Sequence, residues 1–169
     1  MTDIWNRRGF ADAFSKEQSR AARTGRHCGL LLVDMDRFKS INVTYGHQAG
    51  DEAIIEVAGR ISAALRDYDI CARWGGDEFI VLASDVNKTS LAVMASKLLI
   101  AVNHEPMTLS GGTSLDISVS IGGCMVTPDD MLLDATARAD AALYETKRRQ
   151  RNGYMIFDPR EDASHKTAG

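Results

Sequence analysis

Apolar residues along the chain follow two spacings, one typical of helices and one typical of buried strands. Over residues 49–65, Ile54, Val57 and Ile61 fall on one stripe with the 3.6-residue period of an amphipathic helix. The continuous apolar run at residues 29–33 is typical of a buried strand. Applied to the whole sequence, these patterns predict helices at 6–24, 49–65, 88–102 and 132–149, and strands at 28–34, 69–74, 79–83, 115–126 and 154–157.

The order of these elements predicts an α+β fold. Helices alternate with strands, yet only a short glycine-containing turn separates residues 69–74 from 79–83, which indicates an antiparallel hairpin. A central five-stranded sheet with mixed, partly antiparallel pairing and α-helices around it is the expected architecture.

Length and cysteine content fit one domain in a reducing compartment. The chain has 169 residues, enough to bury a core without disulfide or metal staples. We expect the domain at residues 1–157 and a polar C-terminal tail at 158–169. Cys28, Cys71 and Cys124 are widely spaced in apolar runs, which favours reduced core thiols.

Charge and hydropathy argue against two classes of partner. The formal net charge is −3 and the sequence pI is about 5.8, so no global basic field favours binding to a nucleic-acid backbone. The longest apolar stretches are far shorter than the roughly 20 residues of a membrane helix, and the N-terminus lacks a signal-peptide core. The sequence therefore predicts a soluble, cytoplasmic domain without nucleic-acid or membrane contacts.

The turn of the predicted hairpin carries unusual chemistry. Gly75 and Gly76 are expected to adopt positive φ and to bring the backbone close to a bound substrate. Asp77 and Glu78 follow directly, before the apolar residues of the next strand resume. A turn built in this way presents anionic oxygens to a metal ion.

A second pair of carboxylates, Asp34 and Asp36, ends the strand predicted at 28–34. A carboxylate at the end of an apolar strand is unfavourable unless it is exposed, paired or bound to a metal. Taken alone, Asp34 would be interpreted as a solvated strand end, and Asp36 as a residue that supports the metal ligands or the turn. If the two turns lie side by side, Asp34 and Asp77 form a hard-oxygen site suited to Mg²⁺, which binds through one or two carboxylates plus substrate phosphates.

Further motifs accompany this turn in a fixed order. They are NRRGF at 6–10, DMDRFKSIN at 34–42, YGHQAGD at 45–51, GGDEF at 75–79, SVSIG at 118–122 and ADAALYETK at 139–147. With these motifs the chain resembles the GGDEF domain, the diguanylate cyclase family, from its first residues to about residue 157. The resemblance implies a palm-like, ferredoxin-type sheet of the nucleotide cyclase kind.

The resemblance also implies a metal site and a reaction. It assigns Mg²⁺, or Mn²⁺ as a substitute, to the Asp34 carboxylate, the Met35 carbonyl oxygen and Asp77. Asp77 and Glu78 are then the catalytic residues, at a centre where a ribose 3′-hydroxyl attacks an α-phosphate and pyrophosphate leaves. Metal ions assist such a step by lowering the pKa of the hydroxyl and neutralising charge on the phosphate.

Three cations match the phosphate-contacting positions of the family, namely Lys39, Lys147 and Arg151. Lys147 and Arg151 have a simpler explanation as well, because cations near a helix C-terminus are favoured by the macrodipole. The assignment to phosphate therefore depends on motif and position and not on charge alone.

Guanine selection is assigned by resemblance to Asp51 and Asn42. One carboxylate accepts both the N1–H and the exocyclic N2–H of guanine, whereas an amide both donates and accepts. The simpler reading makes Asn42 a turn residue and Asp51 an acid in the first turn of a helix. Relatives that make cyclic GMP-AMP carry a smaller polar residue at the Asp51 position, so Asp51 favours GTP.

The product that the resemblance implies, cyclic di-GMP, joins two guanosines through two equivalent linkages. One domain offers one nucleotide pocket, so two domains have to face each other across a two-fold axis. We therefore expect a catalytic homodimer that uses GTP. An upstream sensory or dimerisation domain, outside this chain, is the further partner that the resemblance implies.

Arg66 and Asp69 match the RxxD inhibitory motif of the family, and five residues separate Asp69 from Gly75. Arginine fits guanine O6 and N7 bidentately, and a carboxylate accepts from another edge of the base. Feedback binding of cyclic di-GMP is the expectation. The alternative is an arginine at a helix end beside a surface acid.

Three positions depart from the usual pattern of the family. Val43 follows Asn42 where an acid is common, Asp3 replaces a turn glycine, and Gln150 replaces the glycine before Arg151. None of these changes removes an inferred metal ligand or guanine contact, so the resemblance favours an active enzyme.

Two rival functions remain at this level. The first is a catalytically silent GGDEF module that binds cyclic di-GMP or GTP as a sensor, against which the intact Asp34, Asp77 and Glu78 argue. The second is a palm-type nucleotidyl transferase acting on polynucleotides. The sequence carries no basic track interleaved with aromatic residues, which argues against the second.

Overall fold

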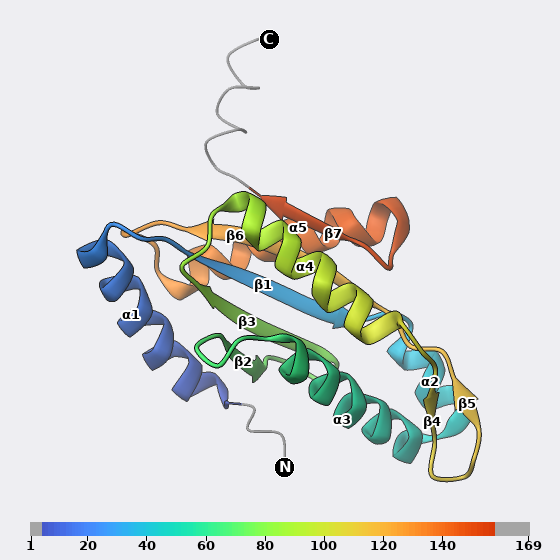
Figure 1. The fold of residues 1–169 in the computed structure, drawn as a ribbon. Helices are drawn as coiled ribbons and strands as arrows, with labels where there is room; N and C mark the ends of the chain where they lie inside the picture. The colour runs from blue at the N-terminus through green and yellow to red at the C-terminus, as the bar shows by residue number, and fades with distance from the viewer. Residues whose placement is uncertain (1–4, 158–169) are drawn as a thin grey trace.

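A five-stranded sheet forms the centre of the computed structural model, which describes residues 5–157 (Figure 1). Its strands are β1 (Cys28–Met35), β2 (Ile70–Arg73), β3 (Glu78–Ser84), β6 (Val119–Val126) and β7 (Tyr154–Phe157), in the order β2-β3-β1-β6-β7. β1 pairs antiparallel with both β3 and β6, while β7 runs parallel to β6. The sheet is mixed, as predicted.

Helices cover both faces of this sheet. They are α1 (Arg7–Thr24), α2 (Phe38–Tyr45), α3 (His47–Ala64), α4 (Lys88–Asn103) and α5 (Leu132–Gln150). From β1 to β6 the chain follows the β-α-β-β-α-β order of ferredoxin-like folds, and α5 with β7 extends the sheet. The predicted α+β, ferredoxin-type architecture is confirmed.

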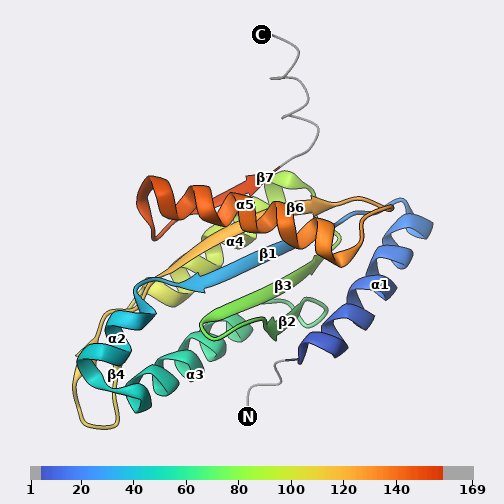
Figure 2. The same ribbon diagram turned by 180° about the vertical axis from the view of Figure 1, so that it is seen from behind.

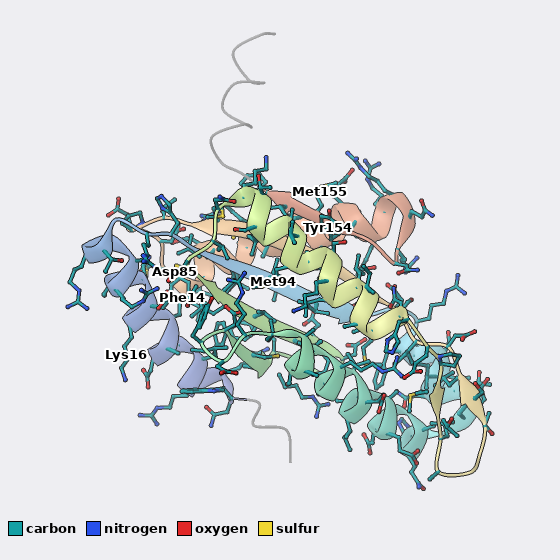
Figure 3. All side chains as sticks on the ribbon, in the orientation of Figure 1. Phe14, Lys16, Asp85, Met94, Tyr154 and Met155 are labelled. Atoms are coloured by element: carbon teal, nitrogen blue, oxygen red, sulfur yellow. The ribbon has the colours of Figure 1, made fainter. Side chains whose placement is uncertain are left out.

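Alternation along β1 divides the core into two layers. Leu31 and Val33 pack in the layer that includes buried residues of α3 and α4, whereas Leu30 and Leu32 pack in the layer that includes residues of α1 and α5. Figure 1 shows α4 in front of the sheet, and the reverse view in Figure 2 shows α5 on the other side. Figure 3 labels one buried side chain from each layer, Met94 of α4 and Phe14 of α1.

The predicted helices and strands are found with small shifts at their ends, and two features differ. Helix α2 was not predicted, because it has eight residues and only one of them, Ile41, is buried, too few for a visible stripe. The strand predicted at 115–126 is interrupted. β5 (Ser114–Leu115) pairs with β4 (Met107–Thr108) in a separate small hairpin, and β6 begins at Val119.

The three cysteines are buried free thiols, as predicted. Burial raises the pKa of Cys28 and Cys71 to about 12 and that of Cys124 to about 11, which disfavours the nucleophilic thiolate at neutral pH. No helix within residues 5–157 combines the length and apolarity needed to cross a bilayer. The departure at Asp3 and the tail predicted at 158–169 lie outside the described residues.

Candidate active site

The turn that carries Asp77 and Glu78 lies against the end of β1. The Met35 N–H donates to the Asp77 carbonyl oxygen at 3.1 Å. Asp34 lies directly opposite Glu78 in the register of β1 and β3. Directly opposed residues on neighbouring strands point to the same face, so the Asp34 and Glu78 side chains share one face of the sheet. The structure therefore brings together the two carboxylate-bearing segments.

Hydrogen bonds within the chain fix the shape of this turn. The N–H groups of Trp74 and Gly75 both donate to the Glu78 carbonyl, at 2.8 and 3.2 Å. The Arg73 guanidinium donates to the carbonyl oxygens of Gly75 at 3.2 Å and Gly76 at 2.7 Å. Backbone hydrogen bonds and the Arg73 side chain therefore hold the turn in shape without a ligand.

The expected positive φ at Gly75 and Gly76 is wrong, because neither glycine lies in the left-handed region. Glycine is required at position 75 for a steric reason instead, because an added Cβ would lie 2.9 Å from Oε2 of Glu78. An added Cβ at Gly76 would meet no protein atom within 4 Å. Gly75 leaves room for the Glu78 side chain, and Gly76 leaves the turn open to an approaching molecule.

Asp34 is a carboxylate in an unfavourable place. Its exposed fraction is 7%, and burial raises its pKa to about 6, with Asp77 and Glu78 contributing in the same direction. Lys147 on α5 opposes the shift, with Nζ 2.8 Å from Oδ1 of Asp34. Three acidic groups therefore act on one small region, where added positive charge is stabilising.

The donor set at this place fits a magnesium ion. Within residues 5–157, the side chains of Asp77 and Glu78 make no hydrogen bond or ion pair, so their oxygens are available. No group of three or more acidic, histidine or cysteine side chains in the described part of the chain is placed to hold a metal by itself. Mg²⁺ needs only one or two carboxylates when substrate phosphates supply other ligands, which matches two acidic segments flanking an open turn.

The Asp36 side chain accepts hydrogen bonds that hold the end of β1 in place. Its carboxylate accepts hydrogen bonds from the Ser118 and Ser120 hydroxyls at 2.8 and 2.7 Å and from the Asn152 N–H at 3.0 Å. These bonds tie the end of β1 to β6 and to the residue after Arg151. Asp36 therefore links the end of β1 to neighbouring segments, in agreement with a supporting role.

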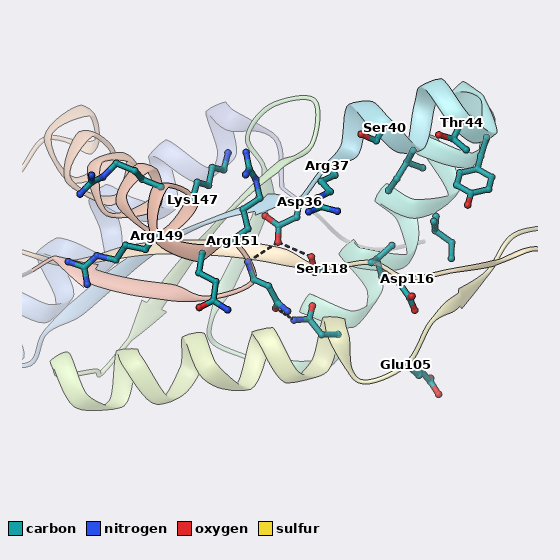
Figure 4. Close-up of a pocket in the computed structure, with 18 residues that line it drawn as sticks. Asp36, Arg37, Ser40, Thr44, Glu105, Asp116, Ser118, Lys147, Arg149 and Arg151 are labelled. Atoms are coloured by element: carbon teal, nitrogen blue, oxygen red, sulfur yellow. Dashed lines mark hydrogen bonds between the residues drawn. The ribbon is translucent and has the colours of Figure 1, made fainter.

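A groove with a volume of about 870 Å³ adjoins these residues (Figure 4). Lys147 and Arg151 line it together with Arg37, and they come from the C-terminal end of α5 and the start of α2. Lys39 is exposed in the first turn of α2 but does not line the groove. The structure thus places two of the three predicted phosphate contacts around one cavity.

Asn42 and Asp51 lie at the junction of α2 and α3. Gly50 of α3 faces the Asn42 side chain, and Asp51 follows it as an exposed residue. Gly46 joins the two helices with φ of 89°, which permits the sharp change of direction. Both predicted base-reading residues therefore occupy one corner of the molecule.

Arg66 and Asp69 form a compact loop between α3 and β2, at the opposite end of β2 from the Gly75 turn. Asp69 accepts from the Arg66 N–H and the Ser84 N–H, both at 3.2 Å. The Arg66 guanidinium is exposed and donates to the Tyr68 hydroxyl at 3.0 Å. Asp69 shapes the loop, while Arg66 faces solvent.

Of the departures from the family pattern, two can be placed. Val43 is 78% exposed on α2, so it makes no contribution to the core. Gln150 is the exposed last residue of α5 and lines the groove. Neither side chain intrudes between the carboxylates of the candidate site.

Sequence reasoning missed two arginines that hold the Gly75 turn. One is Arg73, described above. The other is Arg7 at the start of α1, whose Nε donates to the Trp74 carbonyl at 2.6 Å and whose guanidinium lies 4.7 Å from the centre of the Trp74 ring. The motif around Arg7 was visible in the sequence, but a contact spanning 67 positions was not.

Residues 1–153 match the family model described as diguanylate cyclase, GGDEF domain. Together with the fold and the paired carboxylate segments, this match shows that the chain belongs to the GGDEF family of diguanylate cyclases.

Relatives of known name or structure agree with this placement. The diguanylate cyclase DosC of Escherichia coli K12 is 34% identical over 157 residues, which cover 93% of this chain but 34% of DosC. The chain thus spans about a third of the length of such curated relatives. The solved GGDEF domain of TpbB from Pseudomonas aeruginosa superposes with a TM-score of 0.85 at 31% identity, covering 98% of this chain and 96% of that one. The GGDEF domain of DgcB from Caulobacter crescentus, solved with c-di-GMP, has a TM-score of 0.85 at 30% identity and covers 93% and 92%.

Proposed function

We propose that this domain is a diguanylate cyclase, which condenses two GTP molecules into cyclic di-GMP and releases pyrophosphate. One observation carries the proposal, namely the 3.1 Å hydrogen bond that places the turn of Asp77 and Glu78 against the end of β1. In each half-reaction the 3′-oxygen of one GTP forms a bond to the α-phosphorus of the other. The bond from that phosphorus to the pyrophosphate oxygen breaks, and the hydroxyl proton passes to solvent.

A divalent cation fits between the two acidic segments. Asp34, the Met35 carbonyl and Asp77 would hold Mg²⁺, or Mn²⁺ in its place, and Glu78 is assigned to the reacting centre. When bound, the cation lowers the pKa of the attacking hydroxyl and neutralises charge on the phosphate. Lys147, with Nζ 2.8 Å from Oδ1 of Asp34, favours the charged form of this buried carboxylate and opposes the rise in its pKa.

Fixed cations and polar side chains would orient the nucleotide. Lys147 and Arg151 line the groove of about 870 Å³, where their positive charge suits phosphates, and Lys39 is assigned to the same ligand from the first turn of α2. The backbone of Gly75 and Gly76 gives the substrate close access to the turn. Positioning of this kind supplies much of the rate acceleration in phosphoryl transfer.

Asn42 and Asp51 are assigned to guanine. An amide and a carboxylate in one corner offer acceptors for N1–H and N2–H and a donor for the remaining edge of the base. Adenine presents no matching donor pair, so the proposed substrate is GTP.

The two-fold symmetry of the product requires a homodimer, and an upstream segment outside this chain is the proposed means of bringing two domains together. We assign feedback binding of cyclic di-GMP to Arg66 and Asp69, with the exposed guanidinium as the element that meets a guanine edge. The GTP substrate and three unpaired, buried cysteines favour a cytoplasmic setting.

The test is incubation of the purified chain with GTP and Mg²⁺, with products identified by mass. Cyclic di-GMP and pyrophosphate are expected, and ATP should give no cyclic product. The Asp77→Ala variant should lose synthesis yet still bind cyclic di-GMP, because the two sites lie at opposite ends of β2.

The sensor alternative predicts a different pattern. A silent module would bind cyclic di-GMP or GTP but make no product, even when fused to a dimerising segment. Loss of both synthesis and product binding in Asp77→Ala would contradict the assignment of two separate sites.

A further inference from the structure

Helix α3 contains a glycine at the point where it meets the Asn42 side chain. A Cβ built on Gly50 would lie 2.0 Å from Oδ1 and 2.9 Å from Cγ of Asn42, and 3.2 Å from Cζ of Phe38. Gly50 is buried and its φ is outside the left-handed region, so backbone conformation does not demand a glycine. Glycine inside a helix is unfavourable relative to alanine, and at position 50 an alanine would collide with the Asn42 side chain.

The Asn42 amide has no hydrogen-bonding partner to fix its orientation. Within residues 5–157 the Asn42 side chain makes no hydrogen bond, and only its backbone carbonyl accepts, from the Gly46 N–H at 2.9 Å. The half-buried amide is therefore placed by shape, with its oxygen against the bare Cα of Gly50. Asp51 is the next residue along the helix.

We propose that Gly50 is a positioning residue for base recognition. Because it has no side chain, the Asn42 amide can lie against α3 beside Asp51, with its polar groups directed at the base. The proposal rests on the proposed function, since recognition of guanine by Asn42 is part of that function. It adds a determinant of specificity that does not itself touch the nucleotide.

A methyl group at position 50 should move the amide more than it disturbs the fold. The atom that the new Cβ would meet first is the end of a flexible side chain, which can rotate away. Loss of one polar contact to the base should then weaken guanine-nucleotide binding about tenfold, with little change for adenine nucleotides. Gly59 is the matched control, because it lies in the same helix and an added Cβ there meets nothing within 4 Å.

The experiment is titration calorimetry of the full chain with GDP and with ADP in Mg²⁺, since neither nucleotide can lose pyrophosphate. Wild type, Gly50→Ala, Gly59→Ala, Asn42→Ala and the Gly50→Ala/Asn42→Ala double variant are compared, with melting temperatures recorded. We expect Gly59→Ala to bind as wild type does and to melt at a slightly higher temperature. Gly50→Ala should bind GDP about tenfold more weakly and should cause no further loss once Asn42 is alanine.

Equal GDP affinity in wild type and Gly50→Ala, or independent and additive losses in the double variant, would overturn the inference while leaving the proposed function intact. If Gly50→Ala fails to fold but the double variant folds and binds GDP as Asn42→Ala does, the collision at Asn42 is supported. If neither folds, the inference is wrong. A wild-type chain without preference for GDP over ADP would overturn the proposed base recognition itself, and the inference with it.

Discussion

At the scale of single residues, the burial of Asp34 determines the electrostatics of the site. A carboxylate that is 7% exposed and lies opposite Glu78 is hard to ionise unless a cation is near. Lys147 provides that cation in the protein by itself, and Mg²⁺ would provide a second one in the proposed complex. The same burial makes the stability of the fold depend on pH.

The sign of this dependence follows from the pKa of Asp34, which is raised from 3.8 to about 6 in the folded state. Between these values the folded chain binds a proton that the unfolded chain has released, so folding is favoured at low pH and loses stability as pH rises through about 6. In EDTA, the free energy of unfolding of wild type relative to Asp34→Asn should fall by on the order of 2 kcal/mol from pH 4 to pH 7. Urea titrations at constant ionic strength measure this difference in the free energy of unfolding between wild type and Asp34→Asn. A difference that stays constant or rises with pH would contradict the assigned burial of Asp34.

Gly75 gives a second prediction at this scale. A methyl group there would lie 2.9 Å from Oε2 of Glu78 and should turn that carboxylate away from its present position. Gly75→Ala should lower the rate of cyclic di-GMP formation by about tenfold or more, with little change in the unfolding midpoint. Gly76→Ala is the companion variant, because its methyl group collides with no protein atom and its effect reports on ligand approach alone. A fully active Gly75→Ala enzyme would contradict the assignment of Glu78 to the reacting centre.

At the scale of elements, the start of α1 is linked to the hairpin that carries Asp77 and Glu78. The Arg7 guanidinium donates a hydrogen bond to the Trp74 carbonyl and lies over the Trp74 ring. Phe10 and Trp74 form a T-shaped aromatic pair with ring centroids 6.0 Å apart. The hairpin therefore takes part of its position from a helix at the beginning of the chain. A change in the setting of α1 has a direct route to Asp77 and Glu78.

Replacing Arg7 tests this link. Arg7→Ala should reduce synthesis several-fold and shift the emission of Trp74 to longer wavelength, measured in a Trp5→Phe background in which Trp74 is the remaining tryptophan. Arg8→Ala is the control, since Arg8 is exposed and makes no hydrogen bond or ion pair within residues 5–157. Identical spectra and rates in the two variants would show that Arg7 does not position the hairpin.

Most of the helices and strands were predictable from sequence, because long elements repeat their apolar residues many times. Helix α3 shows its stripe through Ile54, Val57 and Ile61, all of them buried. Helix α2 buries only Ile41, so periodicity carried no signal. Strand β6 begins later than predicted, and residues 114–115 pair instead with residues 107–108 in a separate hairpin, a pairing that the apolar pattern does not distinguish from a continuous strand.

The candidate site was predictable to the extent that its motifs are local. The carboxylates at 34 and 77 were recognisable from their segments, and the structure brings those segments together. The support from Arg7 was not recognisable, because its contact with Trp74 spans 67 positions. Arg73 contacts Gly75 and Gly76, which are near in sequence, but the shape of the turn decides which carbonyl oxygens it meets. The positive φ expected at Gly75 was wrong since glycine there serves a steric need and not a conformational one.

At the scale of the whole molecule, the proposed reaction requires a second copy of the chain. Each domain offers one pair of acidic segments, at Asp34 and at Asp77, and one groove lined by Lys147 and Arg151. The product contains two equivalent linkages. The rate of synthesis per molecule should therefore increase with protein concentration until the dimer is fully formed.

Product binding at Arg66 would lower the rate as cyclic di-GMP accumulates, and Arg66→Ala should lose this binding in calorimetry with cyclic di-GMP.

The central claim is tested most directly by the specific rate of cyclic di-GMP formation, followed by mass over a wide range of chain concentration in GTP and Mg²⁺. The account predicts cyclic di-GMP and pyrophosphate, a specific rate that rises with concentration, and no product from Asp77→Ala at any concentration. Absence of cyclic di-GMP at every concentration and in a fusion to a dimerising segment, despite intact binding of GTP, would contradict it and leave a nucleotide-binding module.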